Sequence, residues 1–169
     1  MIKVVTVSGA KDSGKDDFKR FCYEKLKQHR YITVRWAYDG WAHDIASYCG
    51  CQVRPSNMSD ATFVSAIHRA LIAWDAAVLK DFITAINAYY YTDMDHVIFI
   101  DVDDRAEVAK LQKTFNATTL AICRPGDQPP VDGTFDYIIW NKSALELEAD
   151  KFIIDLLKDA GNTYEPEEP

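Results

Sequence analysis

A glycine-bounded loop carrying a lysine lies near the start of the chain. It follows the apolar run 2–8 directly and precedes the charged, helix-prone stretch 17–29. Two glycines let the backbone turn tightly and aim its N–H groups inward, the helix start adds partial positive charge, and the lysine can reach the outer oxygens of an anion. Strand, loop, lysine and helix in this order are typical of a phosphate-binding P-loop. The candidate phosphate-binding residues are Gly9, Ala10, Lys11, Asp12, Ser13, Gly14, Lys15, Asp16 and Asp17. A chance glycine loop capped by aspartates is the alternative.

Asp16 stands where this motif ordinarily has a Ser or Thr hydroxyl that helps to hold Mg²⁺. A carboxylate can also serve the metal, directly or through water, because Mg²⁺ takes oxygen ligands. Asp101 ends a second apolar run, so we expect it beside the loop, as a metal ligand with Asp16 or as a base. Its alternative role is a helix N-cap, although Asp103 or Asp104 would supply that cap more simply.

The elements that position these residues alternate between strand and helix. Strands are predicted at 2–8, 31–38, 96–102, 118–123 and 135–140, and helices at 17–29, 41–49, 61–90, 103–115 and 144–158. The stretch 61–90 repeats apolar residues at helical spacing, and its length allows two helices or one kinked helix. Alternation predicts an α/β fold: a mostly parallel sheet of about five strands with helices on both faces, and a ligand at the carboxyl ends of the strands.

Composition narrows the classes of function. The 169 residues carry a net charge of -7, so no overall attraction to nucleic acid or anionic membrane is expected. No apolar run reaches the roughly 18 residues of a membrane span, and we expect no signal peptide. The four cysteines lack the spacing of a zinc site, and we expect reduced, buried or inert thiols in a cytoplasmic protein.

Three stretches give the sequence a resemblance to the deoxynucleoside monophosphate kinases of tailed phages, a branch of the P-loop nucleotide kinases. The loop 8–16 ends in the Gly-Lys-Asp characteristic of that family, 120–126 is similar to its strand ending in Arg-Pro-Gly, and 136–146 is similar to its last strand, asparagine and closing helix. Residues 44–50 are a weaker fourth match. The resemblance implies a single three-layer P-loop kinase domain over 1–161, with a helical acceptor or lid region at about 41–92 and a flexible acidic tail at 162–169.

The resemblance also implies roles on the donor side. ATP would be the phosphoryl donor with Mg²⁺, and Lys15 would stabilise charge on the transferring group. Arg124, Pro125, Gly126 and Asn141 would lie near the adenine or its ribose. A surface arginine before a turn, and a helix cap in the case of Asn141, are the alternatives.

The acceptor side departs from the family pattern. The family commonly has Asp-Val-Arg where this chain has Asp101-Val102-Asp103, which leaves Arg105 as the arginine for the acceptor phosphate, or as a local partner of Asp101 or Asp104. Arg69 is a second candidate or a solvated arginine. The family's lysine before Asp44 is His43 here, which is equally typical of a surface histidine. The candidate acceptor residues are Trp41, His43, Asp44, Arg69, Asp103 and Asp104.

We therefore expect an ATP- and Mg²⁺-dependent kinase acting on a deoxynucleoside monophosphate, with Lys15, Asp101, Arg105 and Arg69 as catalytic residues and an open oligomeric state. If the protein is phage-encoded, its compartment would be the host cytoplasm. One alternative is a kinase for the hydroxymethyl group of 5-hydroxymethyluracil in phage DNA. Asp101, Asp103 and Asp104 favour this alternative, whereas the net negative charge disfavours it because DNA binding gains from a basic surface. The other is a P-loop module that binds nucleotide without turnover.

Overall fold

Five strands form one sheet, in the order β2-β3-β1-β4-β5. Their bounds are β1 Ile2–Ser8, β2 Ile32–Ala37, β3 His96–Asp101, β4 Thr118–Cys123 and β5 Tyr137–Trp140. The helices are α1 Lys15–Gln28, α2 Gly40–Tyr48, α3 Met58–Asp75, α5 Arg105–Phe115 and α6 Leu145–Lys158. The structure is a computed structural model that describes residues 2–10, 12–28, 32–37, 40–51, 58–75, 84, 88, 95–128, 133–142 and 144–158.

The pairing of the central strands is parallel. β1 pairs with β3 on one side, with Val5 opposite Phe99, and with β4 on the other side, with Val5 opposite Thr118. β4 pairs with β5 in the same direction. β1 buries every residue from Val4 to Ser8 and β3 every residue from His96 to Ile100, because a parallel strand has a layer of helices against each face. The predicted fold, a mostly parallel sheet of about five strands with helices on both faces, is confirmed.

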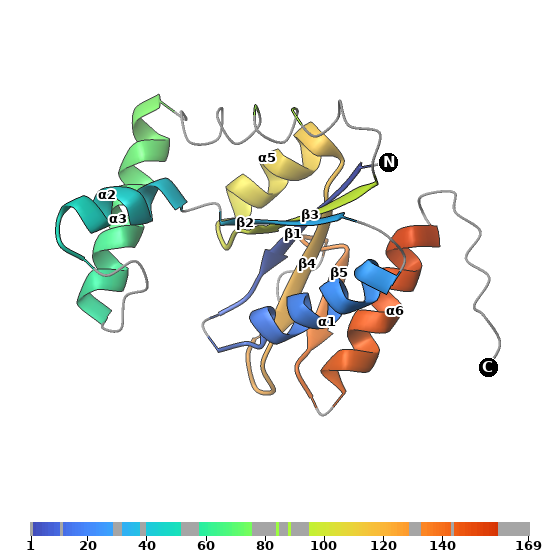
Figure 1. Cartoon of the computed structure of the whole chain (residues 1–169). Coiled ribbons are helices and arrows are strands. Elements are labelled where there is room, and N and C mark those ends of the chain that lie inside the picture. Colours follow the sequence, from blue (N-terminus) through green and yellow to red (C-terminus); the bar gives the residue numbers. More distant parts are fainter. Residues whose placement is uncertain are drawn as a thin grey trace. The chain divides into compact units, whose positions relative to one another are not determined.

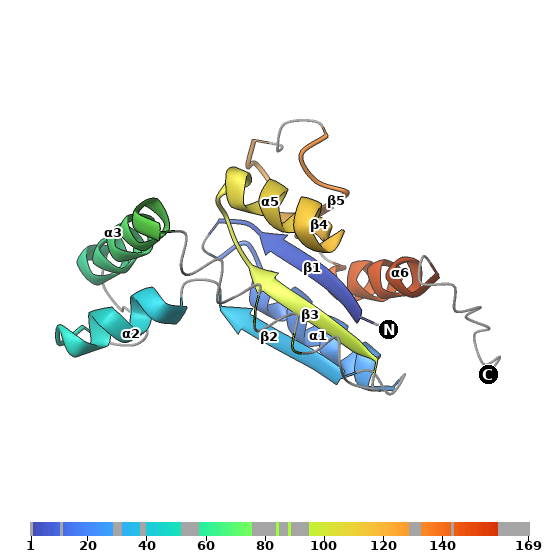
Figure 2. The same cartoon turned by 90° about the horizontal axis from the view of Figure 1, so that it is seen from above.

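The chain divides into two compact units, Met1–Arg35 with Asp93–Pro169, and Trp36–Thr92. In the first unit, α1 and α6 pack against each other on one face of the sheet, and α5 lies on the opposite face against β1 and β4 (Figures 1 and 2). This gives the three layers. In the second unit, α2 packs on α3, and Ala42, Ala46 and Val64 are buried between them.

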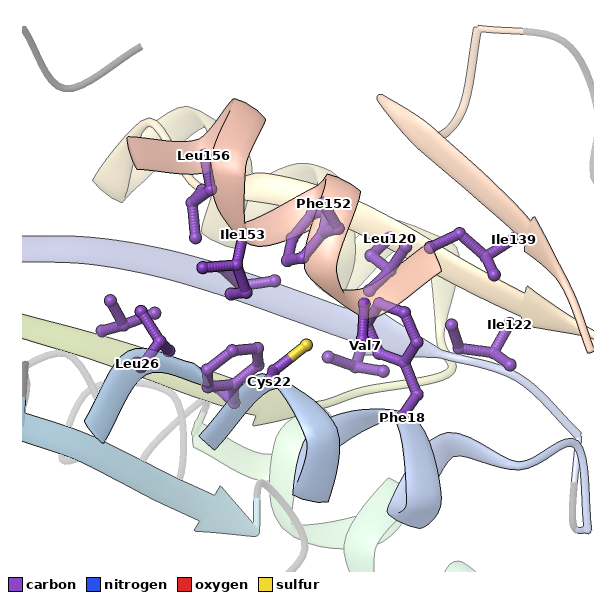
Figure 3. Packing of buried hydrophobic residues seen from close by; sticks show 14 of the residues in the cluster. Val7, Phe18, Cys22, Leu26, Leu120, Ile122, Ile139, Phe152, Ile153 and Leu156 are labelled. Carbon is purple, nitrogen blue, oxygen red and sulfur yellow. The ribbon is translucent and has the colours of Figure 1, made fainter. Parts of the chain in front are cut away.

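The main core lies between α1, α6 and the sheet (Figure 3). Phe18, Cys22 and Leu26 recur along one face of α1 at helical spacing and are fully buried. Phe152 of α6 closes the layer, with its ring centroid 5.8 Å from that of Phe18 and 5.1 Å from that of Tyr137. This core fixes the start of α1, and with it the P-loop, against the carboxyl ends of the strands.

Most predicted boundaries agree with the structure to within two residues. The helix predicted to begin at residue 61 differs, because α3 already begins at Met58. The tail 162–169 and most of 76–94 lie outside the described residues, and with them the question of whether the stretch 61–90 is one helix. None of the helices in the described part of the chain has the length and apolar content of a membrane span.

Candidate nucleotide-binding site

The P-loop joins the end of β1 to the start of α1. The Ser13 N–H donates to the Ala10 carbonyl oxygen at 3.1 Å and closes a tight turn, and the Phe18 N–H donates to the Gly14 carbonyl oxygen at 2.9 Å as α1 begins. The first N–H groups of a helix have no partner within it, and they lie at the positive end of the helix dipole. The backbone therefore presents donors for an anion at this point.

Gly14 is required by both conformation and space. Its φ of +94° favours glycine, and a Cβ there would overlap the side-chain amide of Asn141. That amide is held in place, because Asn141 Nδ2 donates to the Ser13 carbonyl oxygen at 3.0 Å and the Asn141 N–H donates to the Cys123 carbonyl oxygen at 2.7 Å. Asn141 thus ties the end of β5 to β4 and to the P-loop. It does not cap α6, which begins at Leu145.

The residues after β3 are fixed beside the loop by two hydrogen bonds. The Ser8 hydroxyl donates to the Val102 carbonyl oxygen at 2.5 Å, and the Val102 N–H donates to the Val7 carbonyl oxygen at 3.1 Å. The pairing of β1 with β3 is thereby extended beyond Asp101. Asp101 and Asp103, which flank Val102, both reach lysines of the P-loop and α1.

Asp103 contacts the two groups of the P-loop best suited to an anion. Its Oδ1 accepts from the Gly9 N–H at 2.9 Å, and the Lys15 ammonium lies 3.2 Å from Oδ1 and 3.3 Å from Oδ2. The Asp103 side chain remains 65% exposed, so a competing anion can displace it. Lys15 and the Gly9 N–H therefore converge on one negatively charged group.

Asp16 and Asp101 converge on a second cation, the ammonium of Lys19. This nitrogen lies 2.7 and 2.5 Å from the two carboxylate oxygens of Asp101 and 3.1 Å from Oδ1 of Asp16. The Lys19 side chain is only 5% exposed. The structure thus brings the two predicted metal ligands to one point, which a lysine occupies.

The donor set fits Mg²⁺, which commonly takes one or two protein carboxylates together with phosphate oxygens and water. Asp16 and Asp101 are the residues that would hold it, and Asp16 is 92% exposed. Among the described residues, no group of three or more His, Cys, Asp or Glu side chains could hold a metal ion without further ligands. The remaining ligands would therefore have to come from the nucleotide and from water.

A pocket of about 570 Å³ opens beside the first residues of the loop. Asp103 and Arg105 line it together with Gly9, Cys123 and Phe135. Asp104 is the N-cap of α5 and accepts from the N–H groups of Ala106 and Glu107 at 2.9 and 3.1 Å. Arg105 is exposed and forms no ion pair with any described residue, so its guanidinium is available to an anion in this pocket.

The sequence matches no known family profile, and no curated protein is detectably similar to it in sequence. Solved structures do match. A cysteine-to-alanine variant of the APS kinase CysC from Mycobacterium tuberculosis is 17% identical with a TM-score of 0.50, covering 92% of this chain and 96% of that one. The same kinase in complex with AMPPNP and APS is 15% identical with a TM-score of 0.51, covering 92% and 97%. The fold is that of a P-loop kinase. At these identities the likeness establishes the fold alone.

The P-loop kinase fold brings the predicted donor-side residues together only in part. Arg124 begins a turn after β4 in which its N–H donates to Asp127 Oδ2 at 2.8 Å and its guanidinium lies 3.2 Å from Asp127 Oδ1. The backbone hydrogen bond, followed by the side-chain hydrogen bond, lowers the pKa of the Asp127 carboxyl. In the first turns of α1, Asp17 pairs with Arg20 at 3.0 Å. In the loop, Asp12 has a φ of 62°, and Lys11 lies outside the described residues.

Three predicted acceptor residues belong to the second unit. Arg69 is exposed, and its Nε donates to the Ser65 carbonyl oxygen of its own helix at 3.3 Å. His43 is partly buried and Asp44 is exposed on α2, whereas the side chain of Trp41 lies outside the described residues. Their acceptor roles stay predictions, and Arg105 is the predicted acceptor arginine that the first unit contains.

Lys19 is the site residue that the sequence reasoning missed. Positions 15, 19, 22 and 26 fall on one stripe of α1, so the pattern placed Lys19 between the P-loop lysine and the buried Cys22 and Leu26. A lysine on a buried stripe needs a carboxylate partner, and Asp101 was the candidate at the adjoining strand end.

Proposed function

We propose that this protein is a kinase that transfers the γ-phosphoryl group of ATP to a deoxynucleoside monophosphate. One observation carries the donor half: Lys15 and the Gly9 N–H bind the same carboxylate, and these are the groups a nucleotide phosphate would use. The likeness to a kinase solved with AMPPNP, an ATP analogue, supports ATP as the donor.

Phosphoryl transfer depends mainly on positioning and neutralising charge. An acceptor oxygen attacks the γ-phosphorus, the bond to the β–γ bridging oxygen breaks, and ADP leaves. Lys15 neutralises the charge that builds on the transferring group, and Asn141 holds the loop backbone in its binding conformation. Mg²⁺, when bound with the nucleotide, supplies further neutralisation of the phosphate charge, with Asp16 and Asp101 as its protein ligands.

The position of Arg105 favours an acceptor that carries a phosphate group. It stands at the start of α5 in the pocket beside Gly9 and Asp103 and has no ion-pair partner among the described residues. A guanidinium can hold a phosphate through two parallel hydrogen bonds. The pocket volume of about 570 Å³ is within the range of small-molecule sites.

Asp103 favours a second candidate, a hydroxyl acceptor such as the hydroxymethyl group of 5-hydroxymethyluracil in DNA. Its carboxylate lies 3.2 Å from the Lys15 ammonium, where a base could take the proton of an attacking alcohol. A monophosphate needs no such base, because its attacking oxygen carries no proton that must be removed. The two candidates therefore make different use of Asp103 and Arg105.

The test is ADP formation from ATP with each deoxynucleoside monophosphate, with duplex DNA containing 5-hydroxymethyluracil, and with APS. We expect turnover with a monophosphate, about 10²- to 10³-fold lower in Lys15→Ala because a charge-stabilising donor is lost. Lys27→Ala, an exposed lysine in the last turn of the same helix, is the matched control and should retain activity.

Variants of Arg105 and Asp103 distinguish a monophosphate acceptor from a hydroxyl acceptor. For a monophosphate, Arg105→Ala should raise the KM for the acceptor while Asp103→Asn retains turnover. For a hydroxyl acceptor, Asp103→Asn should abolish turnover. Turnover with modified DNA alone would replace the first candidate by the second. ATP binding without turnover on any acceptor would contradict both and leave a nucleotide-binding module.

A further inference from the structure

Lys19 is a buried cation with two carboxylate partners from different parts of the fold. Lys19 lies on the buried side of α1, as do Phe18 and Cys22, and its side chain is only 5% exposed. Asp101 comes from the end of β3 and Asp16 from the first turn of α1. Burial of an ammonium is tolerated when it is paired, and both oxygens of Asp101 supply that pairing at 2.7 and 2.5 Å.

The same two carboxylates are the residues of this site best suited to a divalent cation. Without a cation between them their negative charges would repel each other, and the ammonium removes that repulsion. Lys19 supplies a single charge and hydrogen bonds, whereas a divalent cation would use the oxygens as direct ligands. The lysine and a metal ion therefore compete for the same oxygens of Asp101.

We propose that the Lys19 ammonium occupies the position between Asp16 and Asp101 that a divalent cation would otherwise take. It positions Asp101 and prevents the nucleotide-free protein from binding a divalent cation between these two carboxylates. A metal ion then enters this site only with ligands that a nucleotide supplies. The inference rests on the three-residue geometry and does not require any particular acceptor, or turnover.

A purely structural ion pair predicts a different result. If Lys19 only stabilises the fold, its removal lowers stability and leaves metal binding unchanged. If it occupies the metal's place, removing its charge creates a metal site that the wild-type protein lacks. A gain of binding is therefore the informative readout.

The experiment measures Mn²⁺ binding by electron paramagnetic resonance on the nucleotide-free full chain. We expect Lys19→Met to bind one Mn²⁺ at least about tenfold more tightly than the wild type, because a positive charge at hydrogen-bond distance from the ligands is gone. Lys19→Arg, which keeps the charge, should restore the weak binding. Adding Asp101→Asn to Lys19→Met should remove the gained site.

Arg20→Met is the matched control, since Arg20 forms an exposed pair with Asp17 on the same helix at 3.0 Å. It should gain no Mn²⁺. Lys19→Gln, which keeps a hydrogen-bond donor without charge, replaces Lys19→Met if that variant does not fold. Equal Mn²⁺ affinity in the wild type and a folded, uncharged Lys19 variant would overturn the proposal, as would a gained site that persists in the Asp101→Asn background. Kinase activity plays no part in the readout, so failure here is distinct from failure of the proposed function.

Discussion

Asp103 holds the same groups of the P-loop that a phosphate would hold, and this makes it a competitor of the nucleotide. A carboxylate at Lys15 and the Gly9 N–H must leave before a phosphate oxygen can take its place. Because the Asp103 side chain is 65% exposed, its ion pair is worth only a fraction of what a buried pair would be worth. Its displacement by ATP should therefore cost little.

Replacing Asp103 by Asn should strengthen ATP binding by about two- to fivefold, the range that an exposed ion pair of up to 1 kcal/mol allows. Isothermal titration calorimetry with ATP measures the change. Asp104→Asn is the matched control at the next residue, because asparagine caps a helix as well as aspartate and α5 should keep its start. Unchanged or weaker ATP binding in Asp103→Asn would show that this carboxylate does not compete with the nucleotide.

At Gly14, the cost of a positive φ and the cost of steric overlap with an added Cβ can be measured separately. Gly14 and Gly126 have almost the same φ, +94° and +93°, but an added Cβ at Gly14 has atoms within 4 Å, whereas one at Gly126 has none among the described residues. We expect Gly126→Ala to cost about 1 kcal/mol from its backbone conformation alone. Gly14→Ala should cost about 1–3 kcal/mol more, since Asn141 has to move. Urea unfolding measures both, and equal losses would contradict the close approach of Asn141.

The elements show what a sequence pattern can and cannot determine. The strand predicted at 96–102 was recognisable because the apolar residues Val97 to Ile100 follow one another without interruption, as is typical of a strand covered on both faces. The P-loop was predictable because its glycines, lysine and flanking elements form a local motif. The partners of Asp101 and Asp103 were not predictable, since the pairing of Lys19 with Asp101 joins residues 82 positions apart and depends on strand order. Asn141 was expected to cap a helix or meet a base, but a hydrogen bond to Ser13, 128 positions away, sets its place.

The turn after β4 is an element with a measurable pH dependence. The Arg124 N–H and then the Arg124 side chain lower the pKa of Asp127 below its ordinary value of 3.8. A carboxyl with a lowered folded-state pKa stabilises the turn above its unfolded pKa and loses that effect as the pH falls through the folded value. Between pH 6 and 8 the contact should thus be constant.

An NMR titration of the Asp127 carboxyl should give a midpoint below 3.8. In Arg124→Ala the midpoint should rise only part of the way, because the larger cause, the backbone N–H, remains. Glu107→Ala, a substitution on α5, is the control and should leave the titration of the Asp127 carboxyl unchanged. A midpoint at or above 3.8 in the wild type would contradict the hydrogen bonds of this turn.

At the level of the whole molecule, the four cysteines sample different environments, and all four are free thiols. Cys22 is fully buried in the main core between α1 and α6, whereas Cys49 is exposed at the end of α2 in the second unit. Burial, and then the charge of Asp150, raise the pKa of the Cys22 thiol far above its ordinary value. Cys22 is therefore buried, as expected for an inert thiol, whereas Cys49 is not buried.

Alkylation should follow this division, since the thiolate is the reactive form and needs access to the reagent. At neutral pH, iodoacetamide should modify Cys49 rapidly and leave Cys22 unmodified until the first unit unfolds. Raising the pH within the folded range should not make Cys22 reactive, because its pKa is raised and its side chain is buried in the same core as Phe18 and Phe152. Mass spectrometry of peptides after timed alkylation, with and without urea, measures both rates. Modification of Cys22 at the rate of Cys49 in the absence of urea would mean that α1 and α6 do not close this core in solution, and the P-loop would then lack the support that fixes the start of α1.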